Sequence, residues 1–208
     1  MKHLYGKIKM TWLKVILFAI ATGIYTGAVM MISALDGTSF QDIGIGYEWW
    51  VIFAVILVVN CKKNREAALK CFVFFAVSQP VVYAVEVIFG HITAELGITY
   101  LRMWLPKIIL TLPGGFIAFY CKKQNALGAT VLGLGNAIQL LLGASYLVQA
   151  ARSFPHHILS AIVCFASVFV MSFYIQHTKK YRRLSLCLPV ILLLAALVLL
   201  RATGRVLA

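Results

Sequence analysis

Seven long apolar runs, separated by short polar stretches, constrain this chain more than any other feature of its sequence. A helix needs about 20 apolar residues to cross the hydrocarbon core of a bilayer. The runs do not alternate polar and apolar residues, as the strands of a membrane β-barrel do. They predict transmembrane helices at roughly Thr11–Leu35, Tyr47–Cys61, Ala68–Gly90, Met103–Cys121, Ala126–Val148, His157–Gln176 and Leu184–Leu200.

The composition agrees with this interpretation. Hydrophobic residues make up 62% of the 208 positions, charged residues make up 12%, and the mean hydropathy is +0.92. These values lie outside the range of water-soluble domains. We therefore expect an all-α fold, a polytopic integral membrane bundle of about seven transmembrane helices in a single domain, residues 1–208. Six spans are possible, because the run Tyr47–Cys61 is short for a bilayer and fits a re-entrant segment as well.

The positions of the cations predict the orientation. Lysines and arginines that flank a span are retained on the cytoplasmic side. If all seven runs cross, 14 of the 19 basic residues fall on one side, before the first run and around residues 62–70, 122–123 and 179–183. The formal charge is then +13 on that side and zero on the other. This distribution predicts a cytoplasmic N-terminus in a multi-pass protein of the cell membrane.

The same charge could be taken for a nucleic-acid surface, but it is divided among short segments at the ends of spans. Contacts with the lipid bilayer, and with anionic lipid headgroups on its inner face, explain it better. We therefore expect no nucleic-acid partner. The five cysteines fall near the inner ends of spans or within one, so we expect no disulfide either.

Two of the cationic loops resemble each other. Cys61-Lys62-Lys63 and Cys121-Lys122-Lys123 each follow an apolar run and precede another one. An internal duplication would explain the likeness, with the first three and the last three runs as repeats. Short cationic loops between membrane hairpins also look alike without any duplication.

Two apolar runs carry a stripe of polar residues at helical spacing. Gln79, Tyr83 and Glu86 share one helix face, and an acid in a span favours a position inside the bundle. Alternatively, Glu86 lies near the outer end and simply reaches water. The second stripe contains Asn136, Gln139 and Tyr146. We expect these two faces to meet and to line one ligand-binding cavity, with residues Gln79, Tyr83, Glu86, Asn136, Gln139 and Tyr146.

The fourth run contains Pro113 followed by two glycines, which predicts a kink or an interruption of that helix near the middle of the membrane. Broken helices at that depth are typical of transporters that hold a solute or an ion.

Histidines and acids gather in the segments expected on the outer side. Imidazoles and carboxylates can bind zinc, but no pair has the spacing of a known zinc motif. We therefore predict no metal site, and the weak candidates are His91, Glu95, His156 and His157. Phosphate-binding loops and hydrolase signatures are also absent from the sequence, so we assign no catalytic residue and expect no cofactor.

In size and topology the chain is similar to the substrate-binding membrane subunits of vitamin importers, although the two share no motif. This likeness implies a transporter, or the binding subunit of one, that handles a small polar solute. An intramembrane enzyme is the alternative, with Glu86 beside the outer histidines or with His177 beside a cysteine. A non-catalytic subunit held by membrane-protein partners is the third possibility.

Overall fold

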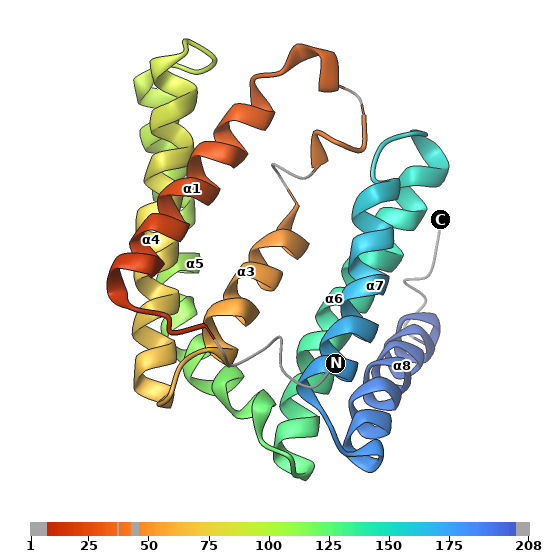
Figure 1. Cartoon of the computed structure of the whole chain (residues 1–208). Helices are drawn as coiled ribbons and strands as arrows, with labels where there is room; N and C mark the ends of the chain where they lie inside the picture. The colour runs from red at the N-terminus through yellow and green to blue at the C-terminus, as the bar shows by residue number, and fades with distance from the viewer. Residues whose placement is uncertain (1–7, 37, 43–45, 203–208) are drawn as a thin grey trace.

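The computed structural model describes residues 8–36, 38–42 and 46–202. These residues contain helices and no strands, and each predicted apolar run coincides with one α-helix. Figure 1 shows the arrangement of these helices. They are α1 (Trp12–Met30), α3 (Tyr47–Val59), α4 (Asn64–Ile88), α5 (Ala94–Ala118), α6 (Ala126–Arg152), α7 (Ile158–Ile175) and α8 (Lys179–Ala202), with short 3-10 helices η1 (Ser33–Leu35) and η2 (Phe119–Lys122).

Within the residues that the structure describes, five helices are long and apolar enough to cross a membrane, namely α1, α4, α5 continued by η2, α6 and α7, and α8 is not among them. The exception among the early helices is α3, which has 13 residues. At about 1.5 Å per residue it is roughly 20 Å long, well short of the hydrocarbon core of a bilayer. The sequence predicted that the second run is short for a bilayer, and the length of α3 agrees with this.

Several helices begin earlier than the apolar runs do, because polar residues cap them. The Thr93 side chain accepts a hydrogen bond from the Leu96 backbone and starts α5 at Ala94, whereas the sequence predicted a start at Met103. Glu66 accepts hydrogen bonds from the backbone N–H groups of Lys62 and Lys63 and starts α4. Such caps satisfy donors that the first turn of a helix leaves free.

The helices form two groups with α3 between them (Figure 1). In the first group α4 packs against α1 and α5, and in the second group α6 packs against α7 and α8. The short helix α3 contacts members of both groups, including α4 and α7. These packing groups differ from the suggested repeat, because α5 belongs to the first group and α3 belongs to neither.

Glycines let α1 and α4 approach closely. A Cβ atom added at Gly23 would lie 2.8 Å from the Ser78 carbonyl oxygen, and one at Gly27 would lie 2.9 Å from the Val82 carbonyl oxygen. Small residues at four-residue spacing are typical of helix pairs in membranes. Gly23 and Gly27 therefore serve the close packing of α1 against α4.

The helix α5 continues through Pro113, so of the predicted kink or interruption, the interruption is wrong. A proline removes only one backbone donor, and neighbouring helices support the chain around it. Gly115 has a packing role, since a Cβ atom there would lie 3.1 Å from the Ala67 carbonyl oxygen of α4. Figure 1 shows the last turns of α5 curving toward α6.

The cationic loops lie together at one end of the bundle, the lower end in Figure 1. There the Lys122 ammonium donates a hydrogen bond to the Cys61 carbonyl, which joins the two Cys-Lys-Lys loops. The Gln176 amide donates to the Cys121 carbonyl at 2.7 Å and joins the third loop to them. The side-by-side position of these loops fits the predicted clustering of positive charge on one side.

Replacing Gly23 with alanine should destabilise the bundle by about 1–3 kcal/mol, because the added methyl group collides with the α4 backbone and Val81. The matched control is Gly135→Ala, where a Cβ atom meets nothing within 4 Å. This control should be neutral or stabilising by roughly 1 kcal/mol, because alanine favours a helix interior. Unfolding in detergent followed by circular dichroism measures both, and equal effects would contradict the packing described.

Thiol chemistry provides a second test. Burial, with a smaller contribution from the Glu66 carboxylate, raises the pKa of the Cys61 thiol to about 11, so the reactive thiolate is scarce at neutral pH. Iodoacetamide should modify the exposed Cys187 first in folded protein. The rate at Cys61 should rise about tenfold per pH unit between about pH 7 and pH 9. Peptide mass spectrometry measures both rates, and a rate at Cys61 that matches Cys187 would contradict this environment.

Candidate functional site

The most polar of the described pockets lies between α1, α3, α4 and α5 and has a volume of about 270 Å³. We call it the Glu86 pocket. Its lining consists of Thr26, Met30, Trp50, Gln79, Val82, Tyr83, Glu86, Tyr100 and Trp104.

The α4 wall of this pocket is the polar stripe that the sequence predicted. Gln79, Tyr83 and Glu86 all line it, since positions four and seven residues apart share a helix face. Gln79 and Glu86 are buried, with exposed fractions of 2% and 6%. The Glu86 side chain therefore lies largely within the bundle.

Gln79 keeps an unused polar group, and Glu86 lacks an ion pair among the described residues. The Gln79 side-chain nitrogen has no hydrogen-bond partner among the described residues. Of the ion pairs in the described part of the chain, none includes Glu86. Buried amides and carboxylates are normally paired, because leaving one unpaired costs free energy. A ligand with a positively charged group for Glu86 and a hydrogen-bond acceptor for the Gln79 amide would pair with both.

Aromatic rings form much of the remaining lining. Trp50 comes from α3, Tyr83 from α4, and Tyr100 and Trp104 from α5. The Tyr83 and Tyr100 rings lie 5.7 Å apart between centroids. Sequence analysis missed Trp50, Tyr100, Trp104 and Thr26, because a single sequence does not reveal which helix faces are neighbours.

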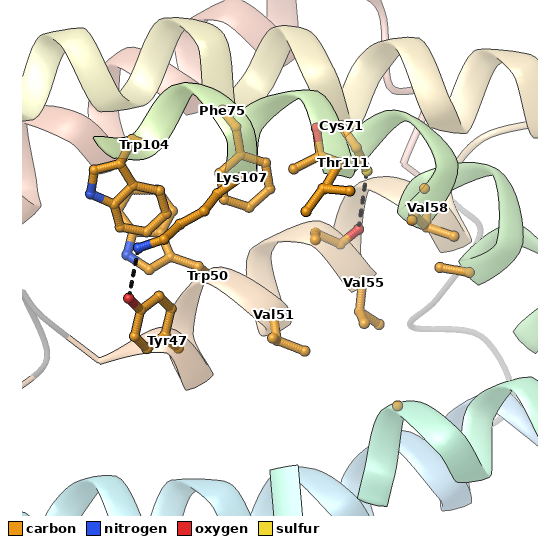
Figure 2. A pocket seen from close by; sticks show the side chains of 16 residues that line it. Tyr47, Trp50, Val51, Val55, Val58, Cys71, Phe75, Trp104, Lys107 and Thr111 are labelled. Carbon is orange, nitrogen blue, oxygen red and sulfur yellow. Dashed lines mark hydrogen bonds between the residues drawn. The ribbon is translucent and has the colours of Figure 1, made fainter. Parts of the chain in front are cut away.

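A second, larger cavity of about 480 Å³ lies on the other side of Trp50 and Trp104, which line both spaces. Figure 2 shows this apolar groove, with the Lys107 side chain reaching toward Tyr47. The Lys107 ammonium is 3.0 Å from the Tyr47 hydroxyl and 4.3 Å from the centroid of the Trp104 ring. The Lys107 cation therefore already has partners. Its side chain lines the groove beside Tyr47 and Trp104.

The second predicted stripe does not line the Glu86 pocket. Asn136 donates to the Ser172 hydroxyl at 2.8 Å and to the Ser185 carbonyl at 3.2 Å, which ties α6 to α7 and α8. Gln139 donates to the Glu48 carbonyl at 3.3 Å. The two stripes therefore do not meet in one cavity, which corrects that expectation: α3 lies between them and receives the bond from Gln139.

Glu48 is the centre of this second polar region. It lies in the first turn of α3, its side chain is fully buried, and the Ser160 hydroxyl of α7 donates to its carboxyl group. Tyr146 interacts with the same carboxyl group and stacks on His157 with 5.6 Å between ring centroids. The residues Asn136, Gln139 and Tyr146 thus support the joint between α3 and the second group of helices.

The weak metal candidates separate into two places. His91 and Glu95 are exposed near the start of α5, and neither belongs to a group of possible metal ligands in the described residues. His156 and His157 lie beside Asp42. For the enzyme alternative, the His177 backbone donates to Gln124, while Cys187 is exposed on α8, and no described hydrogen bond joins the two.

Family models, curated proteins and solved structures were compared with the chain, and none of them matches it. The functional argument therefore rests on the residues themselves.

Removing the Ser160 hydroxyl group, which donates a hydrogen bond to Glu48, should destabilise the fold. Ser160→Ala leaves a buried carboxyl oxygen without its donor, which costs about 1–3 kcal/mol. The control Ser145→Ala removes an exposed hydroxyl from α6 and should change stability by less than about 0.5 kcal/mol. Thermal unfolding in detergent measures the difference, and a neutral Ser160→Ala variant would show that Glu48 does not depend on this bond.

Proposed function

We propose that this chain is a multi-pass protein of the cell membrane that binds a small organic cation in the Glu86 pocket. It acts as a transporter or as the substrate-binding membrane subunit of one. The observation that carries the proposal is the buried Glu86 carboxylate, which lines an aromatic pocket and belongs to no ion pair among the described residues, with the exposed His91 imidazole acting on it from beyond ion-pair distance.

The membrane part of the proposal is supported by the helix surfaces. Five helices have the length and composition of a span, and large apolar side chains remain exposed along them. Examples are Leu17 on α1, Ile109 and Leu110 on α5, and Phe169 on α7. Exposed apolar area on this scale is stable in lipid and unfavourable in water. The cationic loops at one end favour the cytoplasmic side, where they meet anionic lipid headgroups.

The ligand class follows from the chemistry of the lining. A carboxylate attracts an ammonium group, and the faces of tryptophan and tyrosine rings attract cations as well. Aromatic lining next to an acid is typical of sites for quaternary and protonated amines. The free Gln79 amide adds a hydrogen-bond donor for an oxygen atom of the same ligand.

The pocket also limits the size of the ligand. A volume of about 270 Å³ lies just below the range of about 300–1,000 Å³ for sites that enclose drug-sized molecules. An amine with a few carbon atoms and one polar group fits this space. Four separate helices form the walls, so a small change in their packing would open or close the pocket, as transport requires.

Choline should bind to the purified protein, and its uncharged tert-butyl isostere should bind far more weakly. Glu86→Gln should weaken choline binding about 10- to 100-fold, because a charged interaction of about 1.5–3 kcal/mol is lost. Isothermal titration calorimetry in detergent measures this, and a choline-dependent rise in melting temperature provides an independent reading.

The matched control is Glu95→Gln, which removes one exposed acid with the same change of charge. Choline affinity should be unchanged in this variant. An equal loss of choline affinity in both variants would show that the effect comes from the net charge of the protein, and it would contradict a site at Glu86. Equal binding of choline and its uncharged isostere would contradict recognition of a cation.

A further inference from the structure

At the end of the bundle opposite the cationic loops, the chain between α1 and α3 meets the chain between α6 and α7 (Figure 1). The Ser39 hydroxyl donates to the Pro155 carbonyl and accepts a hydrogen bond of 3.2 Å from the Ile158 N–H. The His157 N–H donates to Asp42 Oδ2 at 2.6 Å. More than 100 residues separate these segments in sequence, and the contacts hold them together.

Asp42, His156 and His157 converge at this junction. Their ligand atoms all lie within 4.8 Å of one another. His157 Nδ1 is 3.2 Å from Asp42 Oδ1, and His156 Nδ1 is 4.0 Å from the same oxygen. We call these three residues the outer triad.

The imidazole nitrogens of the outer triad are available for a ligand. Both Nδ1 atoms are buried, and neither has a hydrogen-bond partner among the described residues. The Asp42 side chain is 7% exposed. Two unpartnered nitrogens beside a buried carboxylate form an arrangement that a cation between them would satisfy.

The backbone conformation of His157 independently indicates that the surrounding structure holds this residue in place. Its φ angle is 64°, in the left-handed region, where a non-glycine residue costs free energy and persists because its surroundings hold it. This conformation directs the His157 N–H to one oxygen of Asp42 while its ring faces the other.

We propose that the outer triad binds Zn²⁺, with His156 Nδ1, His157 Nδ1 and an oxygen of Asp42 as ligands. Zinc accepts two imidazoles and a carboxylate at about 2.0–2.2 Å in a tetrahedron, so ligand atoms lie roughly 3.3–3.5 Å apart. The pair of Asp42 and His157 is already near this spacing, and His156 must come closer to both of them. The fourth position accepts a water molecule.

The bound zinc ties the two outer connections together. His157 also stacks on Tyr146, which lies beside Glu48, so the metal site supports the end of α3 that enters the second helix group. This role is structural and separate from the Glu86 pocket, since none of the outer triad lines that pocket.

Zinc chloride alone is the probe. The full chain, purified in detergent and stripped of metal with EDTA, should bind one equivalent of Zn²⁺ in competition with a fluorescent chelator. Its melting temperature should rise as zinc is added, because a ligand of the folded state stabilises it. The variants His156→Gln and His157→Gln should each bind about tenfold more weakly or worse.

The control is His91→Gln, which removes an exposed histidine outside the triad and should leave zinc affinity unchanged. An equal loss in this variant, or no zinc bound by the unaltered chain, would overturn the proposal. If a triad variant fails to fold, Co²⁺ bound to the unaltered chain still identifies the ligands. X-ray absorption that shows imidazole and oxygen ligands would support the site, and sulfur ligands from the cysteines would overturn it.

Discussion

The short helix α3 is the element on which the rest of the structure depends. Glu48 and Trp50 are two positions apart, so they point to nearly opposite sides of the helix. Glu48 contacts Ser160 and Gln139 of the second helix group, and Trp50 packs on Phe74 and Phe75 of the first. A fully buried carboxyl group needs its donors in place, so it fixes how the second group sits on α3.

This arrangement explains why only one of the two polar stripes forms a pocket. The amide groups of the α6 stripe donate hydrogen bonds to other helices: Asn136 donates to α7 and α8, and Gln139 donates to α3. The α4 stripe faces aromatic rings, and the Gln79 side-chain nitrogen has no hydrogen-bond partner among the described residues. Polar groups in apolar helices thus serve packing in one half of the bundle and remain available in the other.

Much of the fold could be predicted from the sequence, because apolar length alone marks each helix. The shared face of Gln79, Tyr83 and Glu86 could also be predicted, since it follows from helical spacing within one segment. Contacts between segments could not be predicted. Nothing in one sequence places Trp104 of α5 beside Tyr47 of α3, or His157 against Asp42. The start of α5 at Ala94 was missed because its first turns are polar, and caps, not hydropathy, decide where a helix begins.

The six acids of the chain, all within the described residues, strengthen the case for a ligand at Glu86. Glu66 pairs with Lys70, Asp42 lies against two histidines, and Asp36 accepts from the Gln41 amide at 2.7 Å. Glu48 accepts from Ser160, and Glu95 is exposed to solvent. Glu86 is buried and belongs to no ion pair in the described part of the chain, and the exposed His91 acts on it only from beyond ion-pair distance. A chain that pairs or exposes its other five acids, and surrounds the sixth with aromatic rings, has the charge pattern of a site for a cation.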